Sequence, residues 1–141
     1  MTPDASNPTD IRSIAVSGED IVAAVETNRT SDRTAVLRVT PPYSGRMRAR
    51  LHVRQRGADG DGVHIDPDTL LTAEAPAYPR PSETEDSLRR DPETEYTVER
   101  HRQRHEQAVE DWRSTITAAV CDRVTLETPS GAHDVDVYVL G

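Results

Sequence analysis

"RTAVLRVTPPYSGRMRARLHVRQR", residues 33–56, is the stretch that decides the fold class predicted by the sequence. Its first eight residues are rich in Val and Thr and stop at Pro41 and Pro42, which is typical of a strand that ends in a turn. After the turn residues "PPYSG", basic side chains alternate with smaller or apolar ones, which predicts a second strand. We therefore expect an antiparallel hairpin.

The second strand of this hairpin carries a basic side chain at almost every second position. One series is Arg46, Arg48, Arg50, His52, Arg54 and Arg56, and the other is Met47, Ala49, Leu51, Val53 and Gln55. Alternate residues point to opposite faces and lie about 6.6 to 7 Å apart on one face, close to two nucleotide repeats of a nucleic-acid strand. The planar guanidinium also binds two phosphate oxygens at once. We predict clamps for an anionic partner at Arg46, Arg48, Arg50, Arg54 and Arg56, with Tyr43 as a stacking residue beside them.

Local patterns predict the elements on either side of the hairpin. "IRSIAV" (11–16) indicates a strand, and "SGEDIVAAVETN" (17–28) indicates a helix with Ser17 as N-cap and Asp20 three residues on. "VHID" (63–66) predicts a short strand, and Pro67 opens a helical turn. Residues 76–92 contain four prolines and predict a linker or surface loop, with room for one or two helical turns over 82–90.

The last third of the chain has the strongest helical pattern. A stripe repeats at spacings of three, four and seven between about Thr97 and Asp122, and consists of Val98, His105, Ala108, Val109, Trp112, Ile116, Ala119 and Val120. Residues 123–128 and 133–141 then flank the turn "PSGA" and predict a hairpin, whose inner face carries Val135, Val137 and Val139. We expect the long helix to pack on the sheet.

Together these elements predict a single α+β domain over residues 11–141, preceded by a flexible tail at residues 1–10. Its antiparallel sheet of about five strands would pack against a long C-terminal helix and a shorter N-terminal helix. The acidic, Pro-rich loop at about 76–92 would lie within this domain. The chain has neither a signal-peptide segment nor an apolar run near the roughly 20 residues of a membrane helix, so we expect a cytoplasmic protein without a membrane partner.

The basic residues are unusual, because all 17 are arginines and the chain contains no lysine. With 25 acidic residues the formal net charge is −8, a balance typical of surfaces that stay hydrated in concentrated salt. The whole chain, especially "TPPYSGRMRARLH" and "ERHRQRHEQAVEDWR", is similar to small uncharacterised proteins of halophilic archaea. This resemblance implies no known activity and no known site.

Charge is also segregated along the chain. Residues 33–58 contain seven arginines and no acid, whereas residues 59–95 contain eleven acids and three arginines. Three interpretations of the basic strand face are open: a solvated or internally neutralised face, a site for nucleic acid or another polyanion, and a site for an acidic protein surface. One further hypothesis is that residues 76–92 fold over the basic face and compete with its partner.

Other candidate sites have weaker support. His101 and His105 lie four residues apart on one side of the predicted helix, which makes them weak candidates for metal ligands, but two ligands do not make a site. The single cysteine, Cys121, has no neighbouring histidine and is more typical of a buried small residue. The sequence contains no nucleophile elbow, Gly-rich phosphate loop or dinucleotide fingerprint, so we expect neither an enzyme nor a cofactor.

The sequence therefore predicts a non-catalytic binding or adaptor protein that contacts an anionic partner through the basic strand face, with nucleic acid as the favoured partner. The alternative is a structural or protein–protein interaction subunit, whose arginines are neutralised by acidic residues of its own or another chain. The sequence leaves the oligomeric state open.

Overall fold

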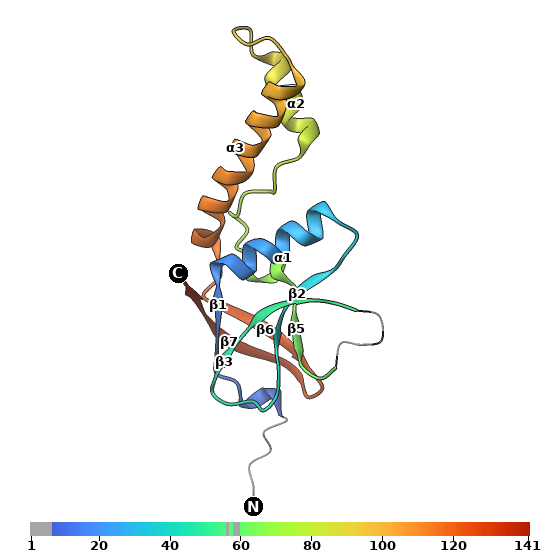
Figure 1. Cartoon of the computed structure of the whole chain (residues 1–141). Helices are drawn as coiled ribbons and strands as arrows, with labels where there is room; N and C mark the ends of the chain where they lie inside the picture. The colour runs from blue at the N-terminus through green and yellow to red at the C-terminus, as the bar shows by residue number, and fades with distance from the viewer. Residues whose placement is uncertain (1–6, 56, 58–59) are drawn as a thin grey trace, which may run out of the picture.

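The computed structural model describes residues 7–55, 57 and 60–141 and has the predicted α+β class (Figure 1). The strands in this part of the chain are β1 (Ser13–Ser17), β2 (Ala35–Val39), β3 (Arg46–Arg48), β4 (Arg50–Val53), β5 (Val63–Ile65), β6 (Arg123–Thr128) and β7 (Gly131–Leu140). The α-helices are α1 (Gly18–Thr30), α2 (Pro81–Arg90) and α3 (Val98–Ile116). Short 3-10 turns are η1 (Pro8–Asp10), η2 (Pro67–Leu70) and η3 (Thr117–Ala119).

The strands form two sheets, and not the single antiparallel sheet that we expected. A four-stranded sheet has the order β3-β1-β7-β6, and a three-stranded sheet has the order β4-β2-β5. Strand β1 is parallel to both of its neighbours, β3 and β7, whereas the other pairings are antiparallel. Parallel strands need a connection longer than a hairpin turn, and between β1 and β3 that connection contains α1 and β2.

Ala49 divides the basic stretch between the two sheets. The predicted hairpin exists as the antiparallel pair β2–β4, but β3 leaves this hairpin and pairs with β1. At the division, Ala49 is fully buried and its backbone N–H donates to the carbonyl of Ala15 at 2.9 Å. Residues 46–53 therefore join the two sheets on one side, while β5 contacts β6 on the other.

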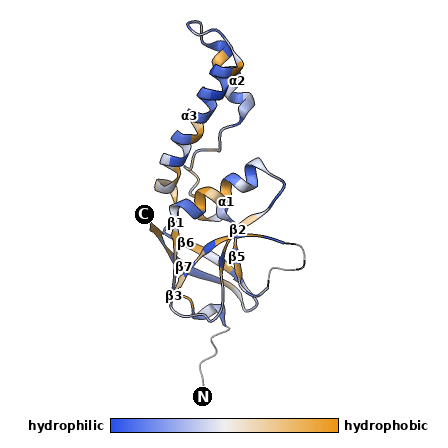
Figure 2. Ribbon diagram, viewed as in Figure 1, coloured by the Kyte–Doolittle hydropathy of each residue, from blue (hydrophilic) through white to orange (hydrophobic). Residues whose placement is uncertain are grey.

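The two sheets enclose one apolar core, and Figure 2 shows that hydrophobic residues recur along the strands. Helix α1 lies across one end of the sheets (Figure 1) and adds Ile21 to this core. The predicted cap of α1 is confirmed, because the Ser17 hydroxyl accepts from the backbone N–H of Asp20 at 3.1 Å. The Asp20 carboxylate in turn accepts from the backbone N–H of Leu51 at 3.1 Å, and this contact ties α1 to β4.

Helices α2 and α3 pack against each other and extend away from the sheets; we call residues 81–116 the arm (Figure 1). The long helix was expected to pack on the sheet, but its apolar side chains Trp112 and Ile116 cluster with Val25 of α1 instead. Helix α2 occupies most of the segment expected to be a loop, because Pro81 falls in its first turn, where proline is tolerated. None of the helices in the described part of the chain combines the length and the apolar character needed to cross a membrane.

Part of the expected N-terminal tail has regular structure. Residues Pro8–Asp10 form η1, Pro8 is buried, and the side chain of Asn7 accepts from the backbone N–H of Thr9 at 3.1 Å. Residues 1–6 lie outside the described part of the chain.

Candidate anion-binding face

Three exposed arginines lie within the stretch that joins the two sheets. Arg46 and Arg48 belong to β3, and Arg50 begins β4; we call these three residues the arginine face. Between them, Met47 is half-buried and Ala49 is fully buried, so the alternation that places apolar side chains inward places the guanidinium groups outward.

The other two predicted clamps follow β4. Arg54 is exposed just beyond the strand, where its backbone N–H donates to the carbonyl of Thr34 at 2.8 Å. Arg56 lies outside the described residues. The arginine face itself is therefore the part of the predicted site that can be placed in the fold.

The strand register brings a further basic group next to Arg50. Arg38 on β2 lies opposite Arg50 on β4 and opposite His64 on β5, so the three side chains share the outer face of the three-stranded sheet. The Arg38 guanidinium donates to the carbonyl of Asp61 at 2.6 Å and lies 3.5 Å from Nδ1 of His52. Arg38 was included in the charge of residues 33–58 but was not predicted as a binding residue. The register of the predicted hairpin could have placed it beside Arg50.

The arginine face carries uncompensated positive charge. Within the described residues, neither Arg46, Arg48 nor Arg50 forms an ion pair. The same three side chains are solvent-exposed, so their guanidinium groups are accessible to an external anion.

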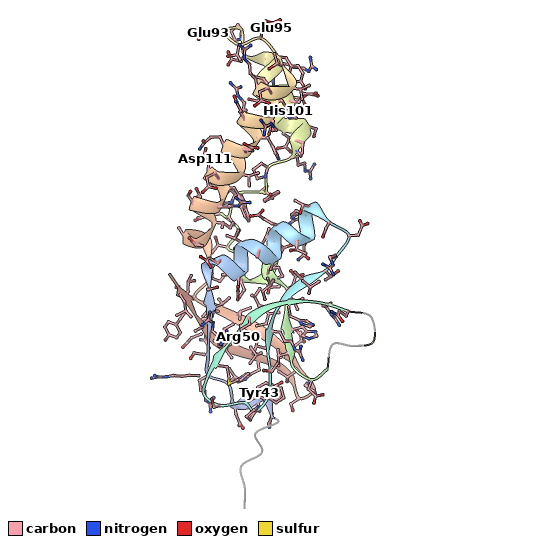
Figure 3. The ribbon with its side chains drawn as sticks, in the orientation of Figure 1. Tyr43, Arg50, Glu93, Glu95, His101 and Asp111 are labelled. Atoms are coloured by element: carbon pink, nitrogen blue, oxygen red, sulfur yellow. The ribbon has the colours of Figure 1, made fainter. Side chains whose placement is uncertain are left out.

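The acidic residues on the arm lie away from the arginine face. Glu93 and Glu95 are at the far tip of the arm, whereas Arg50 is on the body of the protein (Figure 3). Asp91 pairs with Arg104 of α3 at 3.2 Å, and its pKa is lowered by the backbone N–H of Glu93 and by Arg104. The hypothesis that residues 76–92 fold over the basic face is therefore wrong for this structure, because α2 packs against α3.

Tyr43 does not occupy the stacking position predicted for it. Its side chain is part of the core between the sheets and is only 8% exposed. Burial raises the pKa of its hydroxyl, and the negative charge of Asp61 adds to the rise. An exposed aromatic side chain does lie near the arginine face, namely Tyr138 on β7, which is 59% exposed. The alternation that turns Val137 and Val139 one way turns Tyr138 the other way, and this signal was present in the sequence.

A large open groove borders the arginine face. It has a volume of about 1230 Å³ and lies between α1, the last residues of β7 and the last turns of α3. Arg48 is at its rim together with Arg33 and Arg113, but Glu19 and Glu110 also line it. Because both signs of charge are present, this groove has no clear preference for an anion.

The two histidines of the arm join its helices. His101 Nε2 lies 2.9 Å from the carbonyl oxygen of Pro81, and His105 Nδ1 lies 2.9 Å from the hydroxyl of Thr84. Within the described residues, no three His, Cys, Asp or Glu side chains are grouped so that they could hold a metal ion. The contacts to α2 account for both imidazoles as packing groups of the arm.

Comparison with known proteins places the chain in a family. A model described as a domain of unknown function, DUF8009, matches residues 1–141. The chain belongs to the DUF8009 family. No curated protein and no solved structure matches it. Membership in DUF8009 therefore brings no activity or partner from a relative, and function must be argued from the arginine face.

Proposed function

We propose that this DUF8009 protein is a non-catalytic binding or adaptor protein that contacts a polyanion, and specifically nucleic acid, through the arginine face. The observation that carries the proposal is the exposure of Arg46, Arg48 and Arg50 without an ion pair in the described part of the chain. Guanidinium groups in this state favour phosphate, because they bind two oxygens in a plane and lose water more readily than an ammonium group.

The separation of charge supports a local electrostatic preference despite the net charge of −8. The acidic side chains of Glu93 and Glu95 lie at the tip of the arm, whereas Arg50 lies on the body (Figure 3). Exposed charges separated by more than the Debye length of about 8 Å at physiological salt are largely screened from one another. A polyanion at the arginine face is therefore largely screened from the negative charges at the tip of the arm.

The proposal includes a setting, which is the cytoplasm of a halophilic archaeon. The absence of lysine and the excess of acid support this setting. In molar salt the Debye length falls to about 3 Å and the gain from counterion release is largely lost. Only short, bidentate contacts then contribute, and arginine supplies these where lysine does not.

A second candidate function is a protein–protein interaction subunit. It is favoured by exposed apolar side chains in the groove, since Val139 and Leu140 line it and are each 39% exposed. The same groove carries Arg48 at its rim, so an acidic protein surface or a second copy of the chain would meet both apolar and basic groups.

The two candidates are tested by recovering bound partners in molar KCl, with nucleic acid and protein assayed separately. The bait is the native protein, or the Arg48→Glu/Arg50→Glu variant. A matched control is Arg80→Glu/Arg100→Glu, which changes the net charge equally at the N-termini of α2 and α3, where a carboxylate is tolerated. Circular dichroism verifies that each variant is folded.

The proposal expects nucleic acid with the native protein and with the matched control, and loss of nucleic acid with Arg48→Glu/Arg50→Glu. It also expects affinity that falls steeply between low and molar salt. Recovery of the same protein partner by all three baits, without nucleic acid, contradicts the proposal and supports the interaction subunit. Complexes held by apolar burial would be retained or strengthened by salt.

A further inference from the structure

The outer face of the four-stranded sheet places an aromatic ring and the arginine face on either side of β1. In the strand register, Ala15 lies between Arg48 on β3 and Tyr138 on β7, and Ser13 lies between Arg46 and Asp136. Residues opposite each other in neighbouring strands share a face of the sheet. Tyr138, Arg46 and Arg48 therefore project from the same surface.

This surface is hollowed between the arginines and the tyrosine. Ser13 and Ala15 have short side chains, and together with Arg46, Met47 and Tyr138 they line a hollow of about 300 Å³. Adjacent strands are about 4.8 Å apart, so the backbones of Arg48 and Tyr138 are separated by about 9.6 Å across β1. The hollow thus has the short, uncharged side chains of Ser13 and Ala15 at its floor, with Tyr138 and Arg46 among its other lining residues.

The charges around the hollow favour an anion. Asp136 is the acidic residue in the same row as Arg46, but it forms an ion pair with Arg123 at 3.4 Å, on the side away from β1. Arg46 and Arg48 form no ion pair in the described part of the chain, so the uncompensated charge next to the hollow is positive.

We propose that this surface binds single-stranded nucleic acid, with a base stacked on the ring of Tyr138 and the neighbouring phosphates bound by Arg46 and Arg48. This inference rests on the proposed function and names both the form of nucleic acid and a binding residue outside the arginine face. Aromatic side chains stack on bases of any sequence, whereas the bases of a duplex are already stacked on each other and are not accessible.

Stacking also contributes affinity that is retained in concentrated salt. Screening weakens contacts between charges, but it does not weaken the burial of an aromatic face against a base. A surface that combines arginine with an exposed ring therefore keeps part of its affinity under conditions in which a purely basic surface loses it. Tyr138 is the exposed aromatic side chain that the strand register aligns with Arg48.

The test uses the whole chain and measures fluorescence anisotropy with three labelled probes: a 12-nucleotide oligo(dT), a 12-base-pair DNA duplex and inorganic polyphosphate. The variants are Tyr138→Ala, Tyr138→Phe and Arg48→Glu/Arg50→Glu. Val98→Ala is the matched control, because Val98 is 76% exposed and lies on the arm.

We expect Tyr138→Ala to weaken oligo(dT) binding by about 5- to 150-fold, the range for one stacked base. Tyr138→Phe, which keeps the ring, and Val98→Ala should stay within about twofold of the native protein. Polyphosphate has no bases, so Tyr138→Ala should leave its affinity unchanged, while Arg48→Glu/Arg50→Glu should weaken both ligands. The native protein should prefer oligo(dT) to the duplex.

The outcomes separate this inference from the function on which it rests. If the native protein binds none of the three probes, both are overturned. If oligo(dT) binds in an arginine-dependent way but Tyr138→Ala binds it as the native protein does, the stacking inference fails and the polyanion function stands. A duplex bound as tightly as oligo(dT), or an equal loss of polyphosphate binding in Tyr138→Ala, also overturns the inference.

Discussion

Arg113 of α3 binds the carboxylate of Glu26 of α1 through two hydrogen bonds. Its Nε donates to one carboxylate oxygen at 2.6 Å and its second terminal nitrogen donates to the other at 2.8 Å. The hydroxyl of Tyr78 also donates to Glu26, at 3.3 Å. Bidentate pairs of this kind fix orientation as well as supply energy. The pair therefore sets how the arm meets the body of the protein.

The first prediction is that Glu26→Gln lowers the melting temperature at pH 7. The hydrogen bond from Arg113 is the main reason that the pKa of Glu26 lies below its ordinary value of 4.5. A carboxylate with a lowered pKa in the folded state stabilises the fold above its unfolded-state pKa, and this contribution is lost as pH falls through the folded-state pKa. The difference between native and variant should therefore narrow below about pH 4.5, as followed by thermal melts monitored by circular dichroism.

The control for this prediction is Glu110→Gln. Glu110 makes a single contact with the same Arg113 at 3.4 Å and its side chain is 64% exposed, so its removal should change the melt very little. Equal melts for Glu26→Gln and Glu110→Gln at pH 7 would show that the bidentate pair does not hold the arm.

The second prediction concerns the apolar base of the arm. Trp112 is buried, and its Nε1 donates to the carbonyl of Pro76 at 3.0 Å. Its ring packs edge-on against the ring of Tyr78, with the two ring centroids 4.9 Å apart. Trp112→Ala should cost about 3–5 kcal/mol in the free energy of unfolding, because it leaves a cavity and an unpaired carbonyl. Urea unfolding followed by far-UV circular dichroism measures this cost. Val98→Ala on the same helix should change the free energy of unfolding by less than about 0.5 kcal/mol. A similarly small value for Trp112→Ala would show that Trp112 does not stabilise the base of the arm.

The third prediction concerns the turn that supports Arg38. Gly62 has φ of 142°, and a Cβ there would lie 2.9 Å from the carbonyl oxygen of Val39 and 3.0 Å from Nε of Arg38. Gly62→Ala should therefore cost about 1–3 kcal/mol. Gly57 also has a positive φ, of 73°, but among the described residues a Cβ there would have no neighbour within 4 Å, so Gly57→Ala reports the cost of a left-handed φ without a close contact. Chemical denaturation of both variants should show the larger loss for Gly62→Ala; equal losses would mean that the close approach has no energetic consequence.

Much of the secondary structure was predictable because its signals are local. The cap at Ser17 and the turn between β6 and β7 depend on neighbouring residues, and both are present as expected. The parallel pairing of β1 was not predictable in this way, since it joins Ser13 to Arg46 and to Asp136, which are far apart in sequence. Alternation identifies a strand, but it does not name the strand's neighbour.

The candidate site was predictable to the same extent. Alternation correctly turned Arg46, Arg48 and Arg50 outward, as their exposure shows. It did not reveal that Ala49 divides them between two sheets, nor that Tyr43 is buried while Tyr138 is exposed near them. Those facts depend on which strands pair. The helical turns allowed over residues 82–90 are present as α2, which begins at Pro81 because a proline in the first turn permits a helix.

The last prediction follows from the position of Ala49. Its side chain is fully buried where the chain passes from one sheet to the other, and the surrounding space is already filled by the core. Ala49→Val should cost about 1–3 kcal/mol in the free energy of unfolding, because added methyl groups force neighbouring backbone or side chains to move. Ala132→Val makes the same change at an exposed position of β7 and should be nearly neutral. Urea unfolding measures the free energy of unfolding of both variants. A neutral Ala49→Val would mean that the core around Ala49 can accept a larger side chain, and that tight packing there does not fix the arrangement of Arg48 and Arg50.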